Sequence, residues 1–468
     1  MAEQNKNTQQ NELPRVDLRP GGGPGKGGPM GARVHVEKPK NIKKSLIRLA
    51  KYIGKSRVTL LALILLTLLI AVTELASPKL QQEAIDTILE MVGLKQDGLV
   101  KAVVVTGCLP ERYREELEKE IPEIDAVVGI GANADIAKIV SDAVESKKTS
   151  AFPPKEELPL CGRRVLTTPD YWAYLKISEG CSNCCSYCSI PSIRGGLRSR
   201  TKEDIVDEAR TLASQGVKEL IIVAQDVTGY GKDIYGEYAL ASLLKEICKV
   251  DGIEWIRLLY CYPDKVTDEL IDVMATEPKM LHYIDLPLQH ADNGILRAMN
   301  RSSTREQSAQ VIEKLRERMP DIVIRTTFMT GFPGEGEAEF EALAEFVNEM
   351  EFDRLGCFEF SPQEGTAAAL MDGQVDDDVK ARRAEVIMQD QYEINAEKNN
   401  NMIGRTLRVL VEDYDAYSDS YTGRSYMDAP DIDPQIMFTS PRALDNGEFV
   451  DVEIIGVNEY DLVGRAKK

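Results

Sequence analysis

The chain has 468 residues, and its net charge of −19 at neutral pH is unevenly distributed. Residues 1–57 carry 13 Lys and Arg against 4 Asp and Glu, or +9, so the rest of the chain carries −28. An acidic body of this kind repels phosphate backbones and favours basic protein partners, so we expect no strong nucleic-acid binding. Nine cysteines, an odd number without a cleaved secretory signal, indicate metal chemistry in a reducing, cytoplasmic compartment rather than a disulfide framework.

The N-terminal segment divides into a polar part and an apolar part. Residues 1–40 are rich in Gly and Pro and are expected to be a disordered tail, because they cannot bury enough apolar surface. Residues 41–90 are expected to form a basic and apolar helical segment. Its uncharged run at 58–73 is at or just below the shortest length that crosses a bilayer, so it predicts either a membrane tether or a buried helix.

Residues 91–150 have the pattern of an α/β unit. Cys108 follows the first predicted strand directly, at the position where open α/β sheets bind ligands. The pattern predicts two strands and two helices, in the order Leu99–Thr106, Glu111–Glu120, Ala126–Gly129 and Asp135–Val144.

Strands and helices alternate over residues 167–398, which predicts a parallel sheet with helices outside it, in the form of a partial (βα)6 barrel. Two helices have capping sequences at their starts, Thr201 to Asp204 and Thr304 to Gln307. Active sites of such sheets lie at the carboxyl ends of the strands. The predicted strands are Tyr174–Ile177, Glu219–Val223, Trp255–Leu259, His282–Leu286, Ile322–Thr327 and Arg354–Phe358.

Three cysteines follow the first of these strands in the spacing C-x-x-x-C-x-x-C: Cys181, Cys185 and Cys188. Three neighbouring thiolates can hold three irons of a [4Fe-4S] cluster and leave the fourth iron open, whereas four cysteines are usual. Cys184 forms a second C-x-x-C pair with Cys181, so a structural zinc site is the alternative. Zinc sites usually separate their two pairs by a dozen or more residues, and we interpret Cys184 as a bystander.

Residues 403–468 alternate apolar and polar side chains between turn signals, which predicts a small antiparallel β-barrel. Its 7 Lys and Arg against 13 Asp and Glu give a charge of −6. An RNA-binding barrel presents a basic face, so this barrel suits a basic protein partner better.

The cysteine spacing and its setting resemble the radical S-adenosylmethionine (SAM) enzymes. The resemblance implies that Cys181, Cys185 and Cys188 are catalytic, that S-adenosyl-L-methionine occupies the open iron, and that an external electron donor reduces the cluster. Arg194, Arg198 and Arg200 then either steer a carboxylate or are merely solvated.

Four later segments resemble radical SAM methylthiotransferases: AQDVTGYGKD at 224–233, LLYCYPD at 258–264, DLPLQHADNGILRAMNR at 285–301 and RTTFMTGFPGE at 325–335. The C-terminal barrel matches the position of the TRAM domain in the same family. The segments imply contacts with SAM or substrate from Gln225, Asp226, Gln289, Arg325 and Gly331.

The region around Cys108 resembles the second half of the methylthiotransferase N-terminal domain, where three cysteines hold an auxiliary [4Fe-4S] cluster. Cys108 matches the last of the three, and the chain has no cysteine before it. Lys40 to Leu89 instead resembles the start of an ABC exporter permease. We therefore expect a fusion or a mis-joined gene, and an auxiliary cluster that does not assemble.

Two branches of the family are compatible with these motifs. Pro287–His290, Tyr260–Pro263 and GRSYMDAPDID at 423–433 resemble the RimO type, which methylthiolates an aspartate β-carbon in ribosomal protein S twelve. The alternatives are the MiaB type, which modifies adenosine in tRNA, and a non-catalytic adaptor tethered to a membrane. The predicted partner is a basic ribosomal protein.

Overall fold

The computed structural model describes residues 79–160, 162 and 164–467. The predicted tail at 1–40 and the predicted membrane contact at 58–73 lie outside these residues, as does the exporter-like stretch up to residue 78. The end of the 41–90 segment is helical, as predicted, and belongs to α3 (Lys79–Gln96). No helix in the described part of the chain combines the length and apolarity needed to cross a bilayer.

A three-stranded parallel sheet in the order β1-β2-β3 follows α3. The first predicted strand is wrong at its start, because Leu99 is 73% exposed and follows a turn in which Gly98 has φ +74°. The first predicted helix breaks at Tyr113, whose φ of −125° is not helical. The elements are β1 (Val104–Thr106), α4 (Cys108–Arg112), α5 (Arg114–Glu120), β2 (Ala126–Val128), α6 (Ile136–Val144) and β3 (Thr149–Ala151).

The central sheet has six parallel strands in the order β11-β10-β9-β8-β7-β4, which confirms the predicted partial barrel. Each strand lies where the sequence predicts one, with bounds that differ by a few residues. The strands are β4 (Trp172–Lys176), β7 (Glu219–Val223), β8 (Trp255–Leu258), β9 (Met280–Gln289), β10 (Val323–Thr330) and β11 (Arg354–Glu359), and a short pair, β5 (Ser178–Glu179) and β6 (Arg198–Ser199), stands apart from them.

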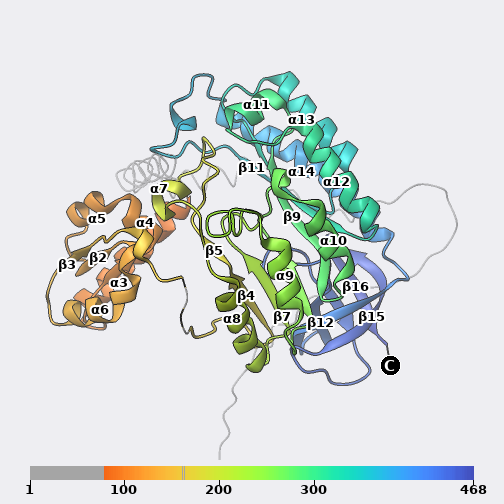
Figure 1. Ribbon diagram of the computed structural model, residues 1–468, viewed down its shortest axis with the longest axis horizontal. Coiled ribbons are helices and arrows are strands. Elements are labelled where there is room, and N and C mark those ends of the chain that lie inside the picture. The colour runs from red at the N-terminus through yellow and green to blue at the C-terminus, as the bar shows by residue number, and fades with distance from the viewer. Residues whose placement is uncertain (1–78, 161, 163, 468) are drawn as a thin grey trace, which may run out of the picture. The chain divides into compact units, whose positions relative to one another are not determined.

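Helices cover one face of this sheet, and their apolar side chains form its main core with those of the strands. In this core α8 contacts β4, α10 contacts β9 and α14 contacts β11 (Figure 1). The helices are α7 (Ile190–Arg194), α8 (Lys202–Ser214), α9 (Leu240–Cys248), α10 (Asp268–Thr276), α11 (Asn293–Ala298), α12 (Arg305–Arg318), α13 (Glu337–Met350) and α14 (Asp377–Asn400).

The C-terminal residues form a closed barrel of five strands in the order β12-β13-β14-β16-β15. The barrel is predicted, but its purely antiparallel form is wrong: β14 and β16 pair in parallel. They can do so because β15 lies between them in the chain and provides the crossover. The strands are β12 (Thr406–Asp415), β13 (Ser420–Arg424), β14 (Ile436–Thr439), β15 (Phe449–Asn458) and β16 (Asp461–Ala466).

The barrel packs on the face of the central sheet that the helices leave open. Trp172, Trp255 and Tyr283 from three strands share a core with barrel residues such as Val409 and Phe438. The barrel therefore covers this face of the sheet.

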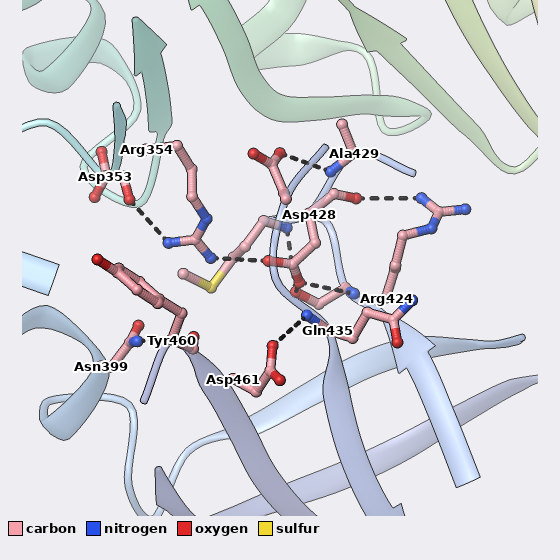
Figure 2. A network of polar contacts seen from close by, with 12 residues as sticks. Asp353, Arg354, Asn399, Arg424, Asp428, Ala429, Gln435, Tyr460 and Asp461 are labelled. Atoms are coloured by element: carbon pink, nitrogen blue, oxygen red, sulfur yellow. Dashed lines mark hydrogen bonds and ion pairs between the residues drawn. The ribbon is translucent and has the colours of Figure 1, made fainter. Parts of the chain in front are cut away.

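Buried ion pairs fix the barrel to the sheet. Glu219 on β7 accepts from Arg257 at 2.9 Å and pairs with Arg424 of the barrel at 2.8 Å. Burial alone would raise the pKa of Glu219, but the two guanidinium groups outweigh it and lower the pKa. Figure 2 shows a second ion pair between sheet and barrel, in which Arg354 of β11 donates to Asp428 at 2.8 Å. The loop after β13 is thus held against the sheet.

Candidate active site

The loop with the three cysteines leaves the sheet at β4 and turns sharply at Gly180. This residue has φ +77°, and a Cβ there would lie 2.1 Å from the carbonyl oxygen of Gly196. Only glycine fits this close backbone approach. The backbone N–H of Cys181 then donates to the carbonyl of Gly195 at 3.1 Å, so the loop closes on itself directly before its first sulfur.

The middle of the loop is held by the segment that follows α11. The backbone N–H of Ser186 donates to the carbonyl of Met299 at 3.0 Å, and its hydroxyl donates to that of Ala298 at 2.8 Å. Asn300 Nδ2 donates to the carbonyl of Cys184 at 2.8 Å. A loop anchored on both sides can hold its sulfurs at fixed positions.

The cysteines of the loop differ in exposure. Cys181 and Cys185 are buried and Cys188 is partly buried, whereas Cys184 is exposed and has φ +52°. Burial raises the pKa of the Cys181 and Cys188 thiols, so a bound cation is needed to hold them as thiolates at neutral pH. Cys184 therefore differs from the other three in its exposure.

The residues present fit a [4Fe-4S] cluster. Donors already reach two sulfurs: Tyr262 Oη lies 3.3 Å from Cys185 Sγ, and the backbone N–H of Ile190 lies 3.5 Å from Cys188 Sγ. Hydrogen bonds to cluster sulfurs are a usual part of such sites. In a cubane cluster each thiolate binds a different iron, so the three sulfurs do not have to converge on one ion. Among the described residues no three His, Cys, Asp or Glu side chains converge as ligands of a single ion.

Asp226 joins the cysteine loop to the ends of β7 and β8. Its carboxylate accepts from Asn183 Nδ2 at 2.9 Å and from Lys265 Nζ, and its other oxygen accepts from the Thr228 hydroxyl at 2.7 Å. The side chain is almost fully buried. Because its oxygens are already occupied, Asp226 positions the loop rather than presenting a free carboxylate.

Three other residues that the sequence singles out lie at strand ends. Gln225 follows β7, and its side-chain oxygen is buried without a hydrogen-bond partner in the described residues, so it is available to a ligand donor. Gln289 ends β9 with φ +74°, an uncommon conformation for a residue with a Cβ. Gly331 follows β10 with φ +73°, and a Cβ there would lie 2.1 Å from Lys380 Cγ.

The structure does not bring Arg325 to this rim. It lies five residues before the end of β10, where it pairs with Asp285 at 3.1 Å and with Asp433 of the barrel loop at 3.5 Å. Burial raises the pKa of Asp285, which Arg325 partly offsets. Arg325 therefore connects the sheet with the barrel, and its guanidinium already has two anionic partners.

The arginines of the cysteine loop are neither free nor merely solvated. Arg200 is buried and pairs with Asp204 at 3.0 Å and with Glu208. Arg198 donates to the carbonyls of Glu156 and Leu158, both at 3.1 Å. The prediction that Arg200 steers a carboxylate or is solvated is wrong, because two acidic side chains of α8 surround it.

Arg194 connects the loop with Cys108. Its guanidinium donates to Glu179 at 3.1 Å and to Cys108 Sγ at 3.1 Å. Cys108 is exposed, and the chain contains no cysteine before it. A [4Fe-4S] cluster is usually held by four cysteine thiolates, so Cys108 alone does not fit a second cluster.

Two residues near the sulfurs were not singled out from the sequence. Tyr262 and Arg301 lie within the segments at 258–264 and 285–301, but their side-chain direction depends on how the strand ends are arranged. A tyrosine and an arginine in loops have no periodic signal. Only the adjacency of the loops after β8 and β9 brings them to Cys185.

These features define a class. Residues 175–347 match the family model of the radical SAM superfamily, and residues 403–466 match that of the TRAM domain. The cysteine loop and four of the six central strands begin inside the first match, and all five barrel strands lie inside the second. The chain is a radical SAM protein with a C-terminal TRAM barrel.

Curated relatives narrow this class to one family. The chain is 47% identical over 389 residues to the ribosomal protein uS12 methylthiotransferase RimO of Desulfitobacterium hafniense, covering 82% of this chain and 86% of the relative. The proteins of the same name from Clostridioides difficile and Thermoanaerobacter are 46% and 48% identical, with 82% of this chain and 86% and 87% of each relative covered. The chain belongs to the RimO family of methylthiotransferases.

Proposed function

We propose that this protein is a radical SAM methylthiotransferase that acts on ribosomal protein uS12. The observation that carries the proposal is the anchored loop at the carboxyl end of a parallel strand, which holds the buried Cys181 and Cys185 and the partly buried Cys188. When bound there, the cluster and SAM supply an adenosyl radical that removes hydrogen from an unactivated carbon. The chain itself holds the sulfurs, through Gly180, Asp226 and the segment after α11.

The substrate assignment rests on the relatives and on charge. The names of the curated relatives specify uS12, a ribosomal protein, and the net charge of −6 on residues 403–468 suits a basic protein. The same charge disfavours the tRNA alternative.

We assign the radical SAM part to residues 167–398, the barrel to 403–468 and the incomplete N-terminal unit to 91–150. The proposed partner is uS12 in the cytoplasm.

Sulfur insertion is the step for which this chain is poorly equipped. Because Cys108 has no cysteine before it in the chain, the cysteine ligands for a second cluster are missing. We expect reductive cleavage of SAM to persist while methylthio transfer to uS12 is weak or absent.

The test is an anaerobic reconstitution of the full chain with iron and sulfide, followed by addition of SAM, reductant and uS12. We expect about four irons per chain, as for one four-iron cluster, and release of 5′-deoxyadenosine. Mass spectrometry of uS12 then measures methylthio transfer directly. Zinc or no metal at the loop, or absence of 5′-deoxyadenosine, would contradict the proposal and favour the adaptor. About eight irons would contradict the missing second cluster.

A further inference from the structure

Cys185 has polar neighbours from two loops that follow different strands. Tyr262, from the loop after β8, places its hydroxyl 3.3 Å from the sulfur. Arg301, from the segment after α11, lies over the ring of Tyr262 with its guanidinium carbon 4.1 Å from the ring centroid. The sulfur thus lies beside a stacked pair consisting of a phenol and a cation.

Arg301 is a buried cation without a carboxylate partner in the described part of the chain. It is 7% exposed, one of its nitrogens donates to the carbonyl of Pro287 at 2.6 Å, and its Nε is buried without a hydrogen-bond partner there. Burial would lower the pKa of its guanidinium, and the neighbours that raise it are Tyr187, Tyr262 and Cys185. None of these carries a negative charge at neutral pH unless the cysteine is a thiolate.

Other buried arginines of the central region differ in this respect. Arg257 pairs with Glu219 at 2.9 Å, Arg354 pairs with Asp428 at 2.8 Å, and Arg383 pairs with Glu335 at 2.8 Å. An unpaired buried charge is strongly unfavourable, so a buried arginine without a carboxylate needs another anion. The ring under Arg301 belongs to Tyr262, whose hydroxyl lies 3.3 Å from the sulfur of Cys185, and this sulfur is an anion when it is a thiolate.

We propose that Arg301, with Tyr262, is the counter-charge of the cluster thiolate of Cys185 and raises the reduction potential of the cluster. This inference rests on the proposed cluster site. Reduction adds one electron from the external donor and makes the cluster more negative, so a nearby buried cation stabilises the reduced form more than the oxidised form. Hydrogen bonds to a ligand sulfur act in the same direction. Arg301 is therefore a positioning residue that tunes the electron transfer preceding SAM cleavage.

The test is a potentiometric titration of the reconstituted full chain, followed by electron paramagnetic resonance of the reduced cluster. We expect Arg301→Met to lower the ratio of reduced to oxidised cluster about tenfold at a fixed potential, which is about 59 mV for a one-electron couple. Tyr262→Phe keeps the ring and removes the hydroxyl, so its shift has the same sign and is smaller. Arg301→Lys retains the charge and restores part of the potential.

The matched control is Arg316→Met on α12, which removes a positive charge whose guanidinium donates to the carbonyls of Met350 and Glu351. It should leave the potential unchanged. If the wild type binds its cluster and Arg301→Met shifts the ratio no more than this control does, the inference is wrong while the proposed function stands. If Arg301→Met binds no iron, the potentials of Arg301→Lys and Tyr262→Phe are measured instead. Potentials equal to that of the wild type in both variants overturn the inference. A wild type without iron overturns both proposals.

Discussion

The three-stranded sheet at 104–151 and the six-stranded sheet at 172–359 both place a cysteine just past the end of a parallel strand. Cys108 follows β1, and Cys181 follows β4 and the short β5. The second cysteine is buried in a loop anchored by several backbone hydrogen bonds, whereas the first is exposed and contacts Arg194. A strand end therefore offers a position for a ligand, but further thiolates and an anchored loop are what make it a cluster site.

The largest effect is expected when one cysteine sulfur is removed from each region. Cys185→Ala should abolish cluster iron and reduce 5′-deoxyadenosine release to background, because two thiolates cannot hold the cubane. Cys108→Ala should leave both quantities unchanged. Iron analysis and chromatography of the SAM products measure the outcome, and equal losses in the two variants would show that the N-terminal cysteine belongs to the same site.

A smaller effect is expected from ion pairs of the two regions. Glu219→Gln leaves Arg257 and Arg424 buried without a full counter-charge and should lower the free energy of unfolding by about 3 to 5 kcal/mol. Glu118→Gln removes the partner of Arg114 in the N-terminal region, where both side chains are more than a third exposed, and should cost about 0 to 1 kcal/mol. Denaturant unfolding of both variants provides the test. An equal decrease in the free energy of unfolding for the two variants would mean that water reaches the ion pairs between barrel and sheet.

The smallest effect concerns helix caps. In the central region Thr304 caps α12 with a reciprocal Gln307 contact, and Thr201 and Thr267 cap α8 and α10. The N-terminal helices α4, α5 and α6 have no such side-chain bond. Thr304→Ala should therefore lower the free energy of unfolding by about 1 kcal/mol, and Thr304→Ser, which keeps the hydroxyl, by less. A cost for the serine variant equal to that of alanine would assign the effect to packing instead of capping.

The strand pattern of the central sheet was predictable because buried parallel strands are short apolar runs with clear turn signals. β7 was predicted to the residue, and β4, β8 and β11 within two residues at each end. The predicted strand start at Leu99 was wrong, because apolar residues next to a glycine turn have the sequence pattern of a strand, and the sequence does not show that Leu99 is exposed. The barrel was predicted from alternation, but alternation does not specify which strands pair, so the parallel β14 and β16 pair was missed.

The site divides in the same way. The spacing of Cys181, Cys185 and Cys188 suffices to predict a cluster, since the ligands are neighbours in the chain. The neighbours of the sulfurs are distant in the chain: Tyr262 lies 77 positions after Cys185. Arg325 was expected at the rim from its motif, yet its partners Asp285 and Asp433 hold it against the barrel.

The amino-acid sequence was enough to predict the α/β architecture, the candidate cluster ligands and the family, because each depends on local periodicity or on residues a few positions apart. Only the tertiary structure decided which charges are paired. Glu219 meets Arg424, and Arg301 lies over the ring of Tyr262, because the order of the strands and the docking of the barrel bring together side chains that no local pattern relates. The electrostatics around the cluster follow from that packing.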